Sequence, residues 1–330
     1  MFSVNQLFAR IMLIIAIAMA TACSDSELAQ GTSRVDLSFS DAAVDDASEV
    51  VITVDKITFQ RNSDESEEDI VVDTFSNADG SGAETFTLDL LTVQGEDSRL
   101  VVDDVQLPVG DYNNMLIEVI DTDNLSYVVD AEGSKPLKVP SNTLKLGSFV
   151  IEPTSTQAMV VEFGLQQSMT YNPGPDRYLL KPRGVRIVSV DKASLITGTI
   201  DHATLQADSR CLPTDTGSTM GNIYLYSGNT LDSAALTDNF DPETQNNQDR
   251  IAPVASSSLD SDSFSLAFLE AGDYTLAVGC SSVPDDADLS ENLVVPTPEN
   301  EIVEFSLGDA ESITCNIPLT LTACSTEPQE

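Results

Sequence analysis

The sequence predicts an all-β protein, with two antiparallel β-sandwich domains in series after a short apolar N-terminal segment. Three observations lead to this fold class. Apolar and polar residues alternate with period two in many short runs, which is typical of strands that bury one face. Gly, Pro, Asn and Asp separate these runs, as turn residues do. Four cysteines lie beyond residue 200, which sets the second half apart from the first.

The first expected domain spans residues 34–191. Its longest alternating run is 50–59, where one strand face is expected to pack and the other to meet water. Further strands are expected at 35–39, 85–90, 115–120, 127–129, 137–139, 149–151, 159–163, 178–182 and 185–190. Residues 41–48 are expected to form a structured loop, with a short helix as the alternative. The acidic residues 62–69 predict an exposed hairpin loop, because burying unpaired carboxylates is costly.

The second expected domain spans residues 195–327. Its strands are expected at 196–200, 200–205, 223–226, 264–268, 274–278, 294–295 and 302–307. The sole histidine, His202, is expected on a strand face. Ser–His and Cys–His nucleophiles need an imidazole beside the reactive group, so one histidine argues against such an enzyme. A hydrolase with paired carboxylates remains an alternative.

The chain is strongly acidic. It has 54 Asp and Glu residues against 15 Lys and Arg residues, which gives a net charge of −39. Such a body repels nucleic acid and anionic membrane surfaces, so no nucleic-acid partner is expected. Because net charge speaks to solubility rather than to fold, solvation of an exported protein is the simplest interpretation, and cation binding is the alternative.

Residues 1–22 have the features of a signal peptide. Arg10 supplies a positive charge, and the apolar run 11–20 is too short to span a bilayer. The next residues resemble a lipobox, filled by Ala20, Thr21, Ala22 and Cys23. The resemblance implies a lipoprotein in which the Cys23 sulfur receives a diacylglyceryl group and the freed amine a further acyl chain such as palmitate. An ordinary cleaved signal, which would release a soluble protein, is the alternative.

Lipid on Cys23 is expected to anchor the protein to the bacterial cell envelope. Each buried methylene contributes ~0.8 kcal/mol, so two or three acyl chains give stable attachment. Residues 23–33 are the lipidated cysteine and a small, polar tether. Ser24 stands where an Asp would favour retention at the inner membrane, so the outer membrane is the expected site. A monomer is expected.

The other four cysteines predict two disulfides. They are Cys211, Cys280, Cys315 and Cys324, an even number in an exported chain. A zinc site is not expected, because no closely spaced cysteine pair occurs. Three pairings are possible. The preferred one joins Cys211 to Cys280, expected at one end of the sandwich, and Cys315 to Cys324, which would clip the C-terminal segment.

Three acidic loops have the oxygen ligands that suit Ca²⁺, at 121–124, 238–243 and 285–291. The last is the densest, and its candidate ligands are Asp285, Asp286, Asp288 and Glu291. None of the loops has the spacing of an EF-hand, so a solvated loop is the alternative for each. No other cofactor is expected.

Several motifs of the first half occur in the order typical of one family. They are the acidic opening with Asp41, Asp45 and Asp46, Leu107-Pro-Val-Gly-Asp-Tyr112, Tyr127-Val-Val-Asp130, Pro136-Leu-Lys-Val-Pro140, and Tyr178-Leu-Leu-Lys-Pro182 with Val185-Arg-Ile-Val188. Over about residues 33–190 the chain therefore resembles the bacterial lipoprotein family of domain of unknown function 4382. The resemblance implies a β-sandwich module on exported lipoproteins and supplies no catalytic residues.

The second half resembles transthyretin-like or carboxypeptidase-regulatory-like β-domains. The resemblance depends on residues 268–278, where Ala271-Gly-Asp273 is expected to join two strands. Gly272 is expected to serve a turn in which φ can be positive. The segment 108–112 has the same Gly-Asp-Tyr character, which suggests two related sandwiches.

These expectations describe a non-enzymatic cell-envelope lipoprotein with a structural or binding role and an unknown ligand. The alternative is a carbohydrate-binding, polymer-binding or Ca²⁺-dependent adhesion accessory, and a hydrolase comes third. The absence of Trp argues against an aromatic sugar platform. Beyond the membrane, an envelope protein or polysaccharide is the expected partner, contacted by loops on a rigid scaffold.

Overall fold

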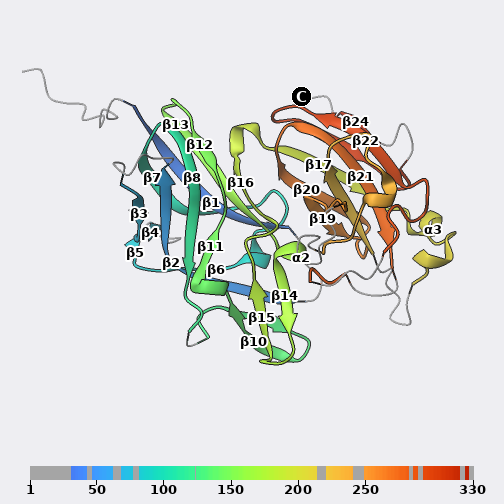
Figure 1. Ribbon diagram of the computed structural model, residues 1–330, viewed down its shortest axis with the longest axis horizontal. Coiled ribbons are helices and arrows are strands. Elements are labelled where there is room, and N and C mark those ends of the chain that lie inside the picture. The colour runs from blue at the N-terminus through green and yellow to red at the C-terminus, as the bar shows by residue number, and fades with distance from the viewer. Residues whose placement is uncertain are drawn as a thin grey trace, which may run out of the picture.

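The structure, a computed structural model, describes residues 31–42, 47–61, 68–76, 82–122, 124–213, 221–240, 249–281, 285–288, 293–319 and 324–326. Its regular elements are mostly strands arranged in sandwiches, which confirms the predicted all-β class. In Figure 1, strands β1–β16 form the body on the left and strands β17–β24 the body on the right. Within the described ranges, no sheet contains strands of both bodies.

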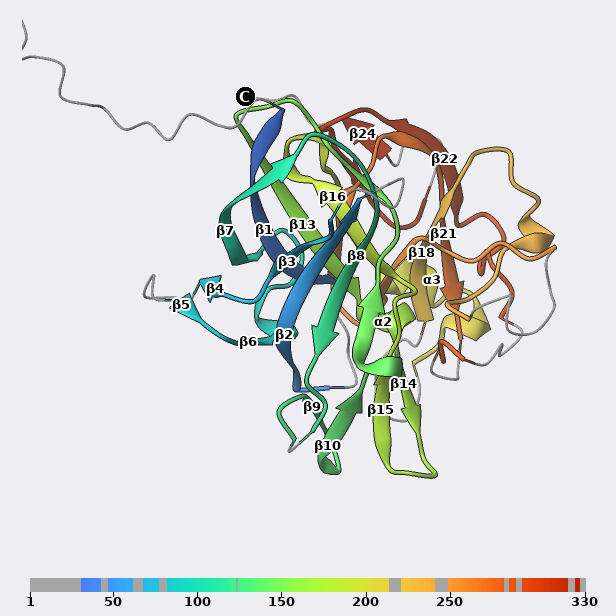
Figure 2. The same cartoon turned by 60° about the vertical axis from the view of Figure 1, so that its left-hand side comes forward.

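The first sandwich packs a four-stranded sheet against a larger one (Figure 2). The smaller sheet has the order β16–β13–β1–β7, with β1 at Thr32–Ala42, β7 at Arg99–Pro108, β13 at Thr156–Gly164 and β16 at Val185–Ser189. The larger sheet has the order β11–β8–β2–β9–β10–β15–β14, with β3, β6 and β12 paired at its sides. Its strands are β2 (Glu49–Arg61), β3 (Ile70–Val72), β6 (Phe86–Asp89), β8 (Gly110–Val119), β9 (Tyr127–Asp130), β10 (Gly133–Lys138), β11 (Thr143–Lys145), β12 (Phe149–Ile151), β14 (Met169–Asn172) and β15 (Arg177–Leu180). Strands β4 (Phe75–Ser76) and β5 (Gly82–Ala83) form a separate pair.

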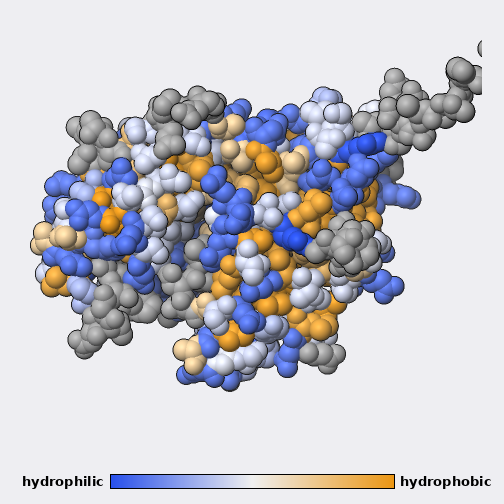
Figure 3. Space-filling view, turned by 180° about the vertical axis from the view of Figure 1, so that it is seen from behind, coloured by the Kyte–Doolittle hydropathy of each residue, from blue (hydrophilic) through white to orange (hydrophobic). Residues whose placement is uncertain are grey.

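Alternation along β1 shows how this core forms. Val35, Leu37 and Phe39 are fully buried, and the polar residues between Val35 and Phe39 are only half-buried. Phe39 packs edge-on against Phe163 of β13, with ring centroids 5.3 Å apart. A buried aromatic ring removes a large apolar area from water, and an edge-to-face pair adds about 0.5–1.5 kcal/mol beyond that burial. Figure 3 shows further apolar residues gathered on the rear face of the first sandwich, on the right of that view.

The sheets are mixed rather than purely antiparallel, which corrects one part of the expectation. Strand β1 pairs with β13 in parallel over Arg34 to Ala42, and β10 with β15 is also parallel. In the second sandwich β17 and β23 are parallel. A hairpin forces antiparallel pairing only between strands joined by a short turn. β1 and β13 are far apart in the chain, so no such constraint applies to them.

The second sandwich contains two four-stranded sheets. One has the order β20–β17–β23–β24 and the other β19–β18–β21–β22. Their strands are β17 (Ser194–Thr199), β18 (Gly221–Ser227), β19 (Ala255–Ser258), β20 (Ser263–Leu269), β21 (Gly272–Cys280), β22 (Ile302–Leu307), β23 (Ser312–Cys315) and β24 (Cys324–Thr326). Gly198 lets β23 approach β17 closely, since a Cβ there would lie 1.8 Å from the Cys315 carbonyl oxygen.

Two expected strands of the second half are wrong. Residues 200–205 contain helix α3 (His202–Leu205), because the Asp201 side chain accepts hydrogen bonds from the Thr204 backbone amide and hydroxyl and so caps a helical turn. Residues 294–295 lie outside any strand. Pro296 follows them directly, and a proline has no N–H to donate to a neighbouring strand.

Three other expectations concern loops and turns. β1 continues through Ala42, so the short helix considered for 41–48 does not begin at its first residues, while 43–46 lie outside the described residues. β2 and β3 are antiparallel and flank the acidic run, but 62–67 also lie outside them. Gly272 does not have a positive φ, whereas Gly110 in the matching turn has φ +134°. A glycine is therefore required by the backbone conformation at Gly110 and not at Gly272.

The expected signal peptide, Cys23 and most of the tether lie outside the described residues, which begin at Gly31. The lipid anchor therefore stays a prediction. Among the helices that the structure describes, none has the length and apolar character needed to cross a bilayer.

Candidate functional sites

Arg186 of β16 connects the two sandwiches. Its guanidinium donates to the Val254 carbonyl oxygen at 2.6 Å and to the Ala267 carbonyl oxygen at 3.2 Å, both in the second sandwich. It also forms an ion pair with Glu162, whose side chain is 3% exposed. Burial raises the pKa of Glu162, and the neighbouring Arg186 opposes that rise. A buried carboxylate needs such a partner, so the pair is a fixed part of the joint.

Other side chains extend this joint. Gln167 donates to the Pro253 carbonyl oxygen at 3.1 Å, and Ser256 contacts the Gln166 side chain at 2.7 Å. Arg183 donates to the Ala287 carbonyl oxygen at 2.8 Å, and Lys181 pairs with Asp288. A small apolar cluster adds Val160 and Val188 from the first body and Ala267 and Phe268 from the second. Lys181, Arg183 and Arg186 thus all contact the other sandwich, so the two bodies meet over a specific interface.

Asp41, at the end of β1, is fully buried close to this joint. Among the described residues, neither of its carboxyl oxygens has a hydrogen bond of standard geometry. The Gln94 side chain and the Leu165 backbone lie close enough to lower the pKa of Asp41, but less than burial raises it. Burial raises the pKa of Asp41 well above its usual value, and the charge of Glu162 adds to that rise. The carboxyl group is therefore expected to stay protonated under conditions where exposed aspartates are ionised. The sequence placed Asp41 in an acidic opening but gave no sign that it is buried.

The described residues predicted to bind Ca²⁺ form hydrogen bonds or ion pairs with different neighbours. Asp285 accepts hydrogen bonds from Tyr224 at 2.7 Å, Asn222 at 3.0 Å and the Asn239 side chain at 2.8 Å. Asp286 accepts from the Asp288 amide, and Asp288 pairs with Lys181. Glu291 lies outside the described residues. Burial raises the pKa of Asp285, and its neutral donors oppose the rise.

The fold brings two of the acidic loops together. Asn239, from the loop that begins at Asp238, contacts Asp285 with both its side chain and its backbone amide. The described part of the chain contains no group of three or more His, Cys, Asp or Glu side chains placed to hold a metal ion. The contacts of Asp285 are those of a buried, hydrogen-bonded carboxyl group that orders the loops around it.

The four cysteines of the second half form two disulfides, Cys211–Cys280 and Cys315–Cys324. This is the pairing preferred from the sequence. Cys211 and Cys280 are part of the hydrophobic core, where their bond joins the short helix η5 (Ser209–Cys211) to the end of β21. Cys315 and Cys324 lie opposite each other on the paired strands β23 and β24. His202 lies at the start of helix α3, with its ring 3.2 Å from the Ser261 carbonyl oxygen and 3.6 Å from Asp262.

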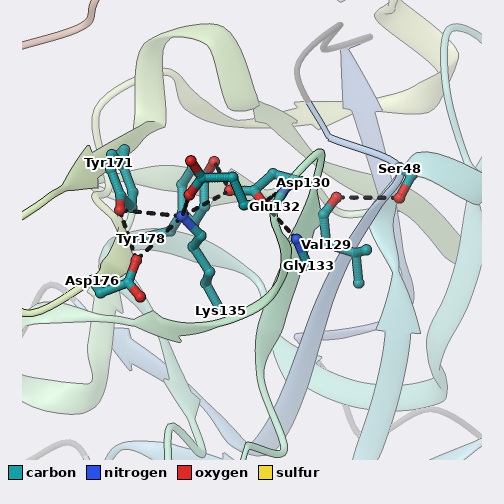
Figure 4. A network of polar contacts seen from close by, with 9 residues as sticks. All are labelled: Ser48, Val129, Asp130, Glu132, Gly133, Lys135, Tyr171, Asp176 and Tyr178. Atoms are coloured by element: carbon teal, nitrogen blue, oxygen red, sulfur yellow. Dashed lines mark hydrogen bonds and ion pairs between the residues drawn. The ribbon is translucent and has the colours of Figure 1, made fainter.

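Lys135 forms the centre of a polar cluster where the hairpins β9–β10 and β14–β15 meet (Figure 4). Its side chain is 8% exposed, and its Nζ lies 2.5 Å from Glu132, 3.2 Å from Asp176 and 3.4 Å from Asp130. The Nζ also lies 4.5 Å from the centroid of the Tyr171 ring. These acids, with Glu132 first, raise the pKa of Lys135. The amine is held in its charged form, which cannot act as a nucleophile, so the cluster fastens two hairpins together.

Two tyrosines have equivalent hydrogen bonds in the two sandwiches. The Tyr112 hydroxyl donates to the Pro108 carbonyl oxygen at 2.9 Å, and the Tyr274 hydroxyl donates to the Glu270 carbonyl oxygen at 2.8 Å. In both cases the acceptor precedes the tyrosine by four residues, across a Gly-Asp-Tyr turn. The sequence detected the repeated motif, and the structure assigns it a common role in closing the turn, as in the tyrosine corner of other sandwiches.

A cleft of about 630 Å³ lies between the sandwiches, next to both Gly-Asp-Tyr turns. Its lining comes from Asp111, Tyr112, Asn113, Ser148, Phe149, Val150, Glu152, Gln157, Met159, Ile187, Val188, Ser189 and Lys192 of the first body and its linker, and Glu270, Ala271 and Asp309 of the second. Val150 is 50% exposed there. Pockets at domain interfaces are common ligand sites. Sequence reasoning missed the cleft, because its walls are distant in the chain.

Comparison with known proteins concerns mainly the first sandwich. Residues 32–182 match the family described as "Domain of unknown function (DUF4382)". This match confirms the resemblance expected over about residues 33–190. Strand β16 begins after the matched DUF4382 region and still pairs with β13, so the sandwich extends beyond that region. The transthyretin-like character of the second half stays a prediction. Among curated proteins, none matches the chain.

Several solved structures align with this one at low sequence identity. The TIE protein of Bacillus anthracis is 12% identical to this chain and has a TM-score of 0.19. The alignment covers 86% of this chain and 34% of the TIE protein, so this chain spans about a third of the length of the TIE protein. The minor pilin GBS52 of Streptococcus agalactiae is 12% identical with a TM-score of 0.17, covering 89% and 97%. The fimbrial anchor protein Mfa2 of Porphyromonas gingivalis is 9% identical with a TM-score of 0.19, covering 86% and 90%. None of these TM-scores reaches 0.5, and we take no function from these proteins.

Proposed function

We propose that this protein is a non-enzymatic lipoprotein of the bacterial cell envelope, in which two sandwiches act as one rigid binding or structural body. The rigid-body part of the proposal is carried by the Arg186 joint, where one side chain pairs with buried Glu162 and donates to two carbonyl groups of the other sandwich. A joint of this kind opposes hinge motion, because any rotation would leave buried polar groups unpaired. A rigid body suits a protein that presents a surface at a fixed position.

The anchor is the second part of the proposal. The lipobox-like sequence ending at Cys23 precedes the polar tether proposed for 23–33, and the first strand, β1, already begins at Thr32. Acyl chains on Cys23 would hold the acidic body at a membrane whose anionic surface repels it. We further propose that the protein is a monomer at the outer membrane, with an envelope protein or polysaccharide as its partner.

Calcium is not part of this proposal. The described members of the set Asp285, Asp286 and Asp288 have different partners and do not converge on one point. We favour a protein partner over a polysaccharide. Sugar-binding sites usually present exposed aromatic rings, and Tyr171 is the one aromatic residue among the exposed large apolar side chains of the described residues.

Replacement of Cys23 tests the anchor. We expect Cys23→Ser to shift the protein from the membrane fraction to the soluble fraction and to remove the acyl mass from its N-terminal peptide, because the serine hydroxyl cannot accept the thioether-linked lipid. Fractionation and mass spectrometry of the mature N-terminus measure both effects. Ser24→Ala is the control and should stay membrane-bound. Unchanged processing and membrane association of Cys23→Ser would contradict the proposal.

A further inference from the structure

The cleft between the sandwiches combines an apolar floor with acidic walls. Phe149, Met159 and Ile187 contribute apolar surface from three strands of the first body. Carboxylates approach from separate elements: Asp111 from β8, Glu270 from the turn before β21, and Asp309 from the turn after β22. Neither Asp111 nor Glu270 has a basic partner within 4 Å among the described residues. The cleft can therefore contact an apolar group of a ligand through its floor and a positively charged group of the same ligand through its walls.

One alkylammonium group already lies in this cleft. Lys192, in the short helix η4 (Val190–Lys192) that leads to the second sandwich, forms an ion pair with Glu152 on the cleft wall. Glu152, followed by Asp309 and Asp191, raises the pKa of Lys192. The chain itself thus shows that the walls stabilise a primary amine on a methylene stem. The Lys192 and Glu152 side chains are 43% and 41% exposed, so this pair is solvated, and the excess of carboxylates along the cleft attracts cations through their summed charge.

We propose that the interdomain cleft binds a primary ammonium group carried on an apolar stem, either a free alkyl diamine or a lysine side chain of a partner protein. The inference rests on the binding role proposed above and gives it a ligand class. The stem would lie on Phe149, Met159 and Ile187, and the ammonium group would lie between Asp111 and Glu270. The rigid joint would keep the two acidic walls at a fixed separation, which lowers the cost of binding.

Calorimetric titration of the full-length protein in detergent tests this proposal. The probes are 1,5-diaminopentane and the capped tripeptides Ac-Val-Lys-Val-NH₂ and Ac-Val-Glu-Val-NH₂. We expect saturable binding of the diamine, the lysine peptide or both, and no binding of the glutamate peptide. Binding of the diamine would assign the site to free amines as well, and binding of the lysine peptide alone would assign it to a protein partner.

Two sets of variants separate the cleft from the general field of a chain with net charge −39. Asp111→Asn with Glu270→Gln should weaken binding about tenfold, as expected from two partly exposed ion pairs. The matched control, Asp103→Asn with Glu84→Gln, changes the net charge equally at exposed positions and should leave binding unchanged. Lys192→Met frees Glu152 and should strengthen binding, whereas Lys145→Met, on the exposed face of β11, should not.

Three outcomes would overturn the inference. They are the absence of saturable binding of both amines, an equal loss of affinity in the control double variant, and weaker binding by Lys192→Met, which would show that Lys192 is the anchor for an anion. None of them bears on the membrane anchor, because fractionation of Cys23→Ser is measured without any ligand. The failure of the ligand class and the failure of the envelope role are thus distinguishable.

Discussion

At the residue scale, the buried carboxyl of Asp41 sets a pH dependence. Its pKa is raised in the folded state by burial and by Glu162, whereas in the unfolded chain it has an ordinary value near 3.8. The folded state therefore holds the proton more tightly. The stabilisation is complete below the unfolded pKa and is lost as the pH rises through the folded pKa. An ionised Asp41 at neutral pH would be a buried charge without a basic partner.

Replacement of Asp41 by asparagine should remove this dependence. We expect Asp41→Asn to match the natural protein in free energy of unfolding near pH 4 and to become relatively more stable as the pH rises towards 8. Urea denaturation across that range measures the difference. Asp103→Asn, at an exposed position, should leave the pH dependence unchanged. A variant that is less stable than the natural protein at pH 8 would show that Asp41 has an ionic partner.

At the element scale, the two Gly-Asp-Tyr turns stabilise the strands that follow them. Tyr112 and Tyr274 are both buried, and each hydroxyl group donates a hydrogen bond to a carbonyl oxygen four residues earlier in the chain. Both rings also stack on a phenylalanine, Tyr112 on Phe149 with centroids 4.9 Å apart and Tyr274 on Phe305 with centroids 6.3 Å apart. The two turns therefore share the hydrogen bond and a stacked ring, and the ring contact is closer in the first.

Phenylalanine variants isolate that hydrogen bond. We expect Tyr112→Phe and Tyr274→Phe each to lower the free energy of unfolding by about 0.5–1.5 kcal/mol, because the ring is kept and one hydrogen bond is lost. Thermal or chemical denaturation measures the loss. The two sites lie in different sandwiches, so the double variant should show the sum of the single losses. Unchanged stability in both single variants would rule out a common role for the turns.

At the scale of the whole molecule, the joint decides whether the two sandwiches unfold together. We expect Arg186→Gln to lower the free energy of unfolding by about 3–5 kcal/mol, because it leaves Glu162 buried without its counter-ion. We also expect the natural protein to unfold in one transition and the Arg186→Gln variant to unfold in two, one for each sandwich. Calorimetry measures both effects.

The matched control for the joint is a surface pair. Arg210 pairs with Asp208 at 2.7 Å, and the Arg210 side chain is 47% exposed. Arg210→Gln should therefore change stability by less than about 1 kcal/mol. In addition, Arg186→Gln with Glu162→Gln should recover part of the loss, because no unpaired charge remains. Equal effects of Arg186→Gln and Arg210→Gln would refute the proposed joint.

Much of the fold could be predicted from local patterns. Apolar runs in the sequence located β1, β2 and β13. β1 alternates as a strand with one buried face does, whereas residues 50–54 of β2 and 159–163 of β13 are buried on both faces, so the water-facing side expected for 50–59 is wrong over 50–54. The same reasoning failed at His202, where a side-chain cap at Asp201 favours a helical turn over a strand. It also failed for the parallel partners of β1 and β17, because strand pairing depends on contacts between distant segments.

The sequence carried weaker signals for the functional features. Glu162 interrupts the apolar run at 159–163, and an acid in such a run indicates a buried charge with a partner. Nothing local, however, identifies Arg186 as that partner or Asp41 as a neighbour. The cleft had no local signal in the sequence, because Asp111 and Glu270 line the same cleft only where the two sandwiches meet.

The sequence by itself determined the β class, the cysteine pattern, the acidic charge and the lipobox-like start, because each follows from composition, period or short spacing. Only the tertiary structure decided which strands pair in parallel, which acids are buried and which walls form the cleft. The physical reason is one of range. Side-chain periodicity and capping act within a few residues, whereas burial, ion pairing and cavity shape arise where segments far apart in the chain meet.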